Sequence, residues 1–170
     1  TPIKTLRGDY RDSEGNTRNR LRRWAKTDFK PSPDDIFQER LYAIHWITKE
    51  TLDKSRQVTF FTSVREDDLR REQQVEAIVK ENLAQWQSDG LVPDMMIEPG
   101  AKTDEPIRTR GWTYWHHLFN ARQLLQYSFY FNFSTPEDYV FNAKSLDWNA
   151  RIANWMTHWA KTNNVFYNQA

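Results

Sequence analysis

The sequence contains no cysteine, which excludes disulfide bonds, thiolate metal sites and a cysteine nucleophile. This absence agrees with a cytoplasmic location, which we expect for the chain. No run of about 18 apolar residues occurs, so no membrane-spanning helix is expected, and no signal peptide is visible. Glycine and proline together occupy only 12 of the 170 positions, whereas 15% of the residues are aromatic. Such a composition is typical of a folded chain rather than a disordered one.

The usual catalytic signatures are also missing. The sequence has no HExxH, GxSxG, GxGxxG or P-loop pattern. Neighbouring side chains such as those of His116 and His117 point about 100° apart on a helix and rarely bind one ion together. The other two histidines, His45 and His158, are isolated in the sequence. We therefore expect neither a metal site nor a complete catalytic apparatus in this chain.

Positive charge is concentrated at the N-terminus, although the net charge is only +1. Residues 1–30 carry nine Lys or Arg against four Asp or Glu. This distribution predicts a basic arm or loop over residues 1–31, with a short helix at Asn19–Ala25. A basic arm suits phosphate contact, but short basic stretches are also common as solvated termini, and both interpretations stay open. The DNA-binding interpretation assigns the contacts to Arg18, Arg20, Arg22, Arg23 and Lys26.

The middle of the chain predicts a hairpin followed by a helix. After the break "KPSPDD", two runs rich in β-forming residues, "RLYAIHWIT" and "VTFFTSV", predict a β-hairpin. Residues 65–90 then change to helical spacing, with Asp67 and Asp68 in the acidic first turn and Gly90 after the last turn. Residues 91–111, "LVPDMMIEPGAKTDEPIRTRG", read as a long connector.

The densest aromatic stretch runs from Arg110 to Phe131. Helical spacing predicts a loop that enters a helix, with Trp115, Phe119 and Leu125 in the core. One helical face would hold Trp115, Leu118, Phe119, Arg122, Leu125 and Phe129. Arg122 interrupts this apolar face, so it must meet an anion, a carboxylate or backbone carbonyls. A salt bridge to Asp104, Glu105 or Asp147 and a contact to phosphate or a neighbouring domain are both open.

The last part of the chain predicts one more helix. Ser134 is a candidate N-cap, with Pro136 and Glu137 in the first turn. Large side chains follow with one-face spacing at Trp148, Ile152, Trp155 and Trp159. The expected fold is mainly α with one β-hairpin (α+β): a helical domain over residues 32–170 with the basic N-terminal arm at residues 1–31.

The block "RGWTYWHHLFNARQLL" resembles a block of large prokaryotic adenine-specific DNA methylases that contain a zinc ribbon. The pieces "DDIFQERLYAIHW", "LVPDMMIEPG", "DWNARIANW" and "NVFYNQA" resemble flanking parts of that family in the same order. The resemblance runs from about residue 34 to the end of the chain. The residues that carry it are Gly111, Trp115, His116, Phe119, Asn120, Arg122, Gln123, Asn149 and Arg151.

Members of that family transfer a methyl group from S-adenosylmethionine to the N6 atom of adenine in DNA. Their upstream Asp-Pro-Phe cofactor motif, their downstream Asp-Pro-Pro-Tyr catalytic motif and their zinc-ribbon cysteines are all absent here. The resemblance therefore implies a fragment of a larger methylase: a non-catalytic central domain for target recognition or scaffolding. It implies no cofactor in this segment, S-adenosylmethionine in the parent enzyme, and as partners DNA and the remaining domains of the parent.

Base methylation requires the adenine to leave the stack, so the parent enzyme needs phosphate contacts and groove-reading side chains. The alternative is a protein-interaction or structural module of a defence or modification cluster that makes no direct contact with DNA. An independent enzyme is the least favoured reading, because the motifs are missing.

Overall fold

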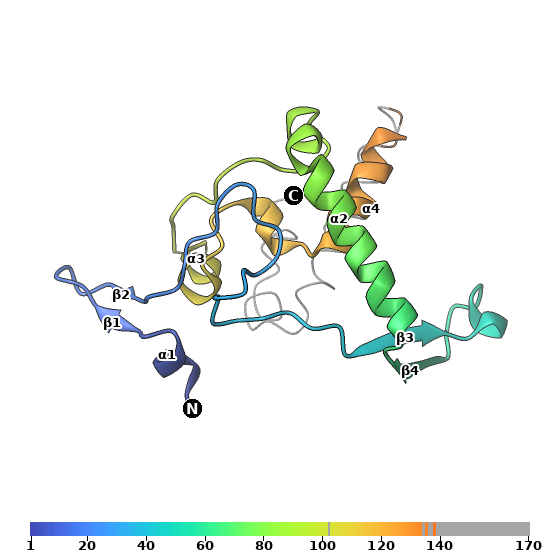
Figure 1. The fold of residues 1–170 in the computed structure, drawn as a ribbon, viewed down its shortest axis with the longest axis horizontal. Coiled ribbons are helices and arrows are strands. Elements are labelled where there is room, and N and C mark those ends of the chain that lie inside the picture. The colour runs from blue at the N-terminus through green and yellow to red at the C-terminus, as the bar shows by residue number, and fades with distance from the viewer. Residues whose placement is uncertain (102, 134, 136–137, 139–170) are drawn as a thin grey trace.

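The computed structural model describes residues 1–101, 103–133, 135 and 138 of the chain. These residues contain both helices and two small antiparallel sheets, so the expected mixed α+β class is confirmed (Figure 1). The elements are α1 (Ile3–Leu6), β1 (Tyr10–Arg11), β2 (Thr17–Arg18), β3 (Ala43–Ile47), η1 (Lys49–Thr51), β4 (Thr59–Ser63), α2 (Glu66–Ser88), α3 (Asp104–Arg110), η2 (Trp115–Leu118) and α4 (Ala121–Asn132).

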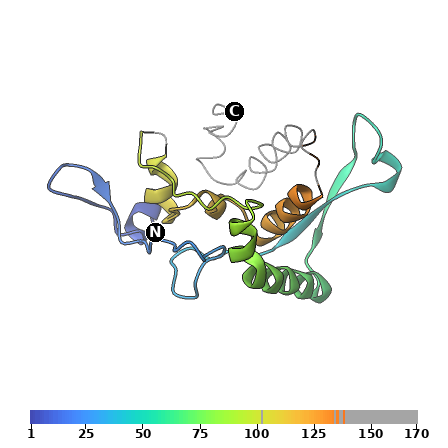
Figure 2. The same cartoon turned by 90° about the horizontal axis from the view of Figure 1, so that it is seen from above.

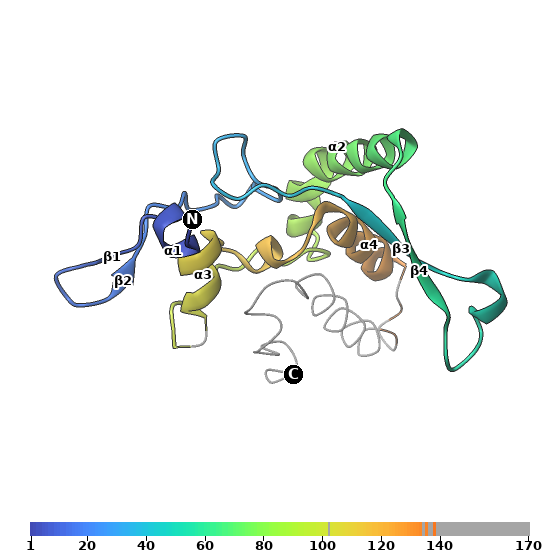
Figure 3. The ribbon, with the colours of Figure 1, turned by 90° about the horizontal axis from the view of Figure 1, so that it is seen from below.

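The two hairpins lie at opposite ends of the molecule (Figures 1 and 3). The predicted hairpin is confirmed: β3 pairs antiparallel with β4, from Ala43 opposite Ser63 to Ile47 opposite Thr59. The expectation of a single hairpin was wrong, because β1 also pairs with β2. Its turn is closed by the Asp12 carboxylate, which accepts the N–H groups of Glu14 and Asn16.

The long helix α2 follows the prediction closely. Its first turn holds Glu66, Asp67 and Asp68, and the Asp68 carboxylate accepts the Arg65 backbone N–H at 3.0 Å. Gly90 follows the helix with a φ of 74°, the left-handed conformation expected at this position. The face that buries Val79, Leu83 and Gln87 brings α2 against α4 (Figure 2).

The predicted connector contains α3, which the sequence pattern did not indicate. Pro106 stands in the first turn of this short helix, where its missing N–H is harmless. The helix stops at Gly111, which adopts a φ of 78°. Before α3, the connector runs beside the aromatic block, since Ile97 N–H donates to the Thr113 carbonyl at 2.8 Å and Trp115 N–H to the Met95 carbonyl at 3.2 Å.

The aromatic block does not form one continuous helical face, so that part of the prediction was wrong. Trp115–Leu118 form a 3₁₀ turn, Phe119 is extended, and α4 begins only after Asn120. The break moves Arg122 and Phe129 to exposed positions. The face that α4 buries consists of Ala121, Leu124, Tyr127 and Ser128. The predicted core positions hold, with Phe119 buried and Trp115 and Leu125 packed against the core.

The core joins residues of the predicted arm to α2, α4 and the segment between them. Trp24 and Phe29 are buried in it beside Val79, Leu83, Val92, Trp112, Leu118, Phe119, Ala121, Leu124 and Tyr127. The helix expected at Asn19–Ala25 is absent, because these residues run without regular structure toward their buried tryptophan. The predicted C-terminal helix, including Asn149 and Arg151, lies outside the described residues. Among the helices of the described residues, none has the length and apolar character that a membrane span requires.

Candidate functional site

The most elaborate polar arrangement joins residues 19–29 to residues 107–119, and we call it the junction. Gly111 stands at its centre, where its carbonyl accepts the Trp24 N–H at 2.9 Å. The end of α3 is held from the same segment: the Asn19 amide donates to the Arg108 carbonyl and the Arg23 guanidinium donates to the Ile107 carbonyl. A cation is favourable there because helix carbonyls and the helix dipole present negative charge.

Two adjacent histidines complete the junction. His117 Nε2 lies 3.0 Å from the Ala25 carbonyl, and its Nδ1 accepts N–H groups of Thr113 and Tyr114 at 3.1 and 3.2 Å. His116 Nε2 lies 3.1 Å from the Asp28 carbonyl, and its Nδ1 lies 3.3 Å from the Gln87 amide nitrogen. These partners require the proton on Nε2 of each neutral ring, with Nδ1 as the acceptor.

The junction keeps both histidines uncharged at neutral pH. Burial and, to a smaller extent, the neighbouring His116 together lower the pKa of His117 to about 3. Burial also lowers the pKa of His116. The ring centroids of the two residues are 4.4 Å apart, and Trp24 lies against His117 with a centroid distance of 5.2 Å. A protonated ring here would lose its acceptor atom and face a second buried imidazole.

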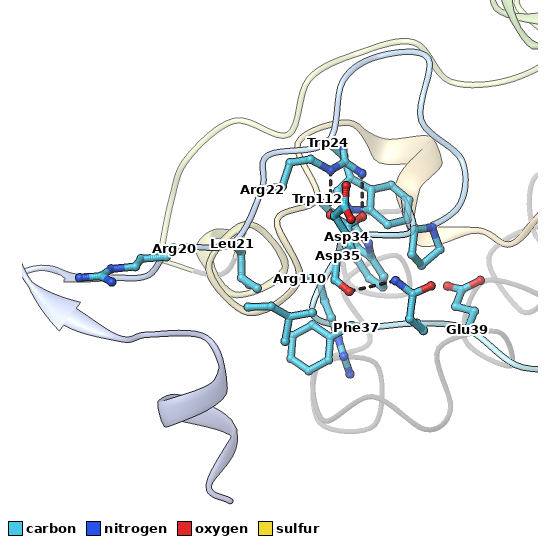
Figure 4. Close-up of a pocket in the computed structure, with 13 residues that line it drawn as sticks. Arg20, Leu21, Arg22, Trp24, Asp34, Asp35, Phe37, Glu39, Arg110 and Trp112 are labelled. Atoms are coloured by element: carbon cyan, nitrogen blue, oxygen red, sulfur yellow. Dashed lines mark hydrogen bonds and ion pairs between the residues drawn. The ribbon is translucent and has the colours of Figure 1, made fainter.

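A cleft of about 340 Å³ opens beside the junction. Its walls come from residues 20–24, residues 31–39 and the pair Arg110 and Trp112 (Figure 4). Arg22 crosses one side of it as a bidentate partner of Asp35, with N···O distances of 2.8 and 2.7 Å, and also pairs with Asp28. Trp24 and Trp112 meet edge to face, with ring centroids 6.3 Å apart.

Arg110 is the most distinctive side chain of the cleft. Its guanidinium lies 4.8 Å from the centroid of the Phe37 ring, a cation–π distance. Within the part of the chain that the structure describes, this guanidinium has no hydrogen bond or ion pair. Burial lowers the pKa of Arg110, the Arg7 charge lowers it too, and Glu39 opposes both. Arg110 therefore has donors to offer a carboxylate or phosphate.

The structure uses most of the predicted DNA-binding cations internally. Arg18 pairs with Asp12, Arg22 with Asp28 and Asp35, and Lys26 with Asp94. Arg23 donates to a backbone carbonyl at the end of α3, as described above. Arg20 is exposed and its guanidinium points away from the cleft in Figure 4. DNA contact by these five residues stays a prediction, and four of them would first have to leave a partner.

The block "RGWTYWHHLFNARQLL", residues 110–125, is here called the family-like block, and its polar residues have local structural roles. Asn120 caps α4: its side-chain oxygen accepts the Gln123 N–H at 3.1 Å, and Gln123 Oε1 accepts the Asn120 N–H at 2.9 Å. Arg122 pairs with Glu72 of α2 rather than with Asp104 or Glu105. This pair links α4 to α2 and is partly exposed, with 47% of the Arg122 side chain accessible.

These arrangements support positioning rather than chemistry. Neither His116 nor His117 has a serine or carboxylate nucleophile as partner among the described residues, because their ring nitrogens are occupied by Gln87 and by backbone groups. No group of three or more potential metal ligands occurs among the described residues. Sequence patterns missed the junction because the hydrogen bonds between its two segments join positions 84 to 92 residues apart. The two adjacent histidines in an apolar block were the one feature of the sequence that could have indicated the junction.

Comparisons of the chain with protein-family models, with curated proteins and with solved structures give no match.

Proposed function

We propose that the chain is a non-catalytic, scaffolding central domain of an S-adenosylmethionine-dependent adenine-specific DNA methyltransferase. The junction is the observation that carries this proposal. Gly111, His116, Asn120 and Gln123 of the family-like block hold the backbone of two distant segments together or start α4. Polar groups committed to internal hydrogen bonds fit a rigid support better than a reaction centre, which needs groups directed at a substrate.

The proposal includes the arrangement of the domain around its two main helices. We infer a helical domain in which α2 and α4 form the central pair and the junction fixes residues 19–29 against it. The methyl donor and the reacting adenine would be bound by other parts of the parent enzyme, through the motifs that this sequence lacks. A fixed support of this kind contributes to methylation by placing DNA-contacting elements relative to the catalytic part.

The test is a product analysis of the gene that encodes this segment. The full coding sequence around it is expressed in cells without adenine methylation, and genomic DNA is digested and measured by mass spectrometry for N6-methyladenine. We expect N6-methyladenine with the intact gene and a strong decrease when Gly111 is replaced by alanine, with Gly90→Ala as the matched control. Absence of N6-methyladenine from the intact gene product contradicts the proposal.

A further inference from the structure

The hairpin of β3 and β4, with its flanks over residues 40–65, projects from one end of the molecule and is here called the ribbon (Figures 1 and 3). Much of its large apolar surface is exposed to solvent. The exposed fraction reaches 72% for Tyr42 and 70% for Phe61. The other exposed large apolar residues of the ribbon are Trp46, Ile47, Leu52, Val58 and Phe60. An accumulation of this kind marks an interaction surface.

The ribbon also differs from the N-terminal segment in how its positive charge is paired. It holds five Lys or Arg and two Asp or Glu. All five cations are exposed, and none of their charged groups forms an ion pair or a hydrogen bond with a described residue. By contrast, five of the nine cations in residues 1–30 form ion pairs with carboxylates. The ribbon cations are Arg40, Lys49, Lys54, Arg56 and Arg65.

The rings of the ribbon lie on its two strands, and three of its cations lie in the connecting loop. His45 and Phe61 stand opposite each other on the two strands and stack, with ring centroids 4.3 Å apart and planes 10° from parallel. On the other face, Trp46 donates to Thr62 Oγ1 at 2.9 Å, which fixes the indole across the strands. Lys49, Lys54 and Arg56 lie in the loop that joins the strands.

We infer that the ribbon is the DNA-binding element of this chain, with the loop cations on phosphates and the exposed rings against bases. A two-stranded ribbon fits the major groove of B-DNA, Lys and Arg neutralise phosphates, and exposed rings stack on unpaired bases. The net positive charge of the ribbon favours DNA over an apolar protein partner. This inference rests on the proposed function, because it names the surface by which that domain reaches its DNA.

The test measures binding of the 170-residue chain to a fluorescently labelled duplex, and to one of its strands, by anisotropy over a salt series. The triple variant Lys49→Ala/Lys54→Ala/Arg56→Ala is expected to reduce the salt slope by up to about three units. Arg70→Ala/Arg71→Ala/Lys80→Ala removes the same charge from α2 and is expected to keep the slope. Phe61→Ala is expected to weaken single-strand binding roughly tenfold with an unchanged slope.

Several outcomes overturn the inference. An equal reduction of the salt slope in both triple variants means that the net charge of the protein, and not the ribbon, drives DNA binding. Absence of binding to either DNA excludes the ribbon as a DNA surface, yet leaves the scaffolding function standing if the intact gene product makes N6-methyladenine. Binding to phosphatidylserine vesicles but not to DNA, lost in the ribbon variant, assigns the ribbon to a membrane surface instead. Circular dichroism of each variant confirms that the exposed substitutions leave the fold unchanged.

Discussion

Gly111 has no room for a side chain. A Cβ atom at this position would lie far inside van der Waals distance of the Arg22 carbonyl oxygen, and the φ of 78° already disfavours other residues. We expect Gly111→Ala to lower the free energy of unfolding by about 3 kcal/mol or more, through backbone strain and loss of the Trp24 hydrogen bond. Chemical denaturation monitored by tryptophan fluorescence measures this loss.

Gly90 supplies the matched control for that substitution. Its φ is 74°, but a Cβ atom there would meet nothing within 4 Å. Gly90→Ala should therefore cost only about 1–2 kcal/mol, the strain of a left-handed residue. Equal losses for the two variants would contradict the close packing of Gly111 against the segment at Arg22.

The buried histidines make stability depend on pH. The pKa of His117 is about 3 in the folded protein, against an ordinary value of 6.5. Between these two pH values the unfolded chain therefore binds more protons than the folded one. The stabilisation from the neutral His117 ring is present above pH 6.5 and is lost as the pH falls toward 3, by up to about 1.4 kcal/mol per pH unit. His117→Gln should reduce the slope of the unfolding free energy against pH between pH 6.5 and 5. An unchanged slope in the His117 variant would contradict a neutral, buried imidazole.

The helices α2 and α4 are joined by apolar packing more than by charge. Leu124 is fully buried between them, so Leu124→Ala should cost about 2–5 kcal/mol. The Arg122–Glu72 pair is partly exposed, and such pairs contribute less than about 1 kcal/mol. Arg122→Met should thus leave the unfolding free energy nearly unchanged, and a double-mutant cycle with Glu72→Gln measures the coupling. A coupling above about 2 kcal/mol would contradict a weak surface pair.

Elements with a local signal were predictable from the sequence, and those held by distant contacts were not. The helix α2 and the ribbon strands follow from residue spacing and composition, which act within a few positions. The β1–β2 hairpin has no alternating apolar pattern, since all four strand residues are exposed. The late start of α4 depends on the Asn120–Gln123 cap, which the aromatic spacing of the block concealed. The buried position of Trp24 depends on partners near Gly111, far along the chain.

Across the whole molecule, the pairing of cations differs between the junction, which we propose as a structural support, and the ribbon, which we propose as the DNA-contacting surface. Near the junction, Arg22 pairs with two aspartates and Lys26 with Asp94, whereas Arg110 lies against the Phe37 ring without an ion pair to a described residue. At the opposite end, the ribbon cations have no described partner. Net charge per sequence segment pointed to the N-terminus because it counts residues and ignores their partners. The structure groups five exposed cations without described partners on the ribbon, which supports the proposal that the ribbon contacts DNA.

The chain alone should neither bind S-adenosylmethionine nor methylate DNA, because it lacks the Asp-Pro-Phe and Asp-Pro-Pro-Tyr motifs expected in the proposed parent methylase. The cleft is the place where such binding would first appear, since its aromatic walls and its volume of about 340 Å³ match small-molecule sites. Isothermal titration with S-adenosylmethionine should show no binding, and a labelled methyl donor should transfer nothing to duplex DNA. Low-micromolar affinity, lost in Arg110→Met, would place the cofactor site in this cleft and contradict a purely supporting domain.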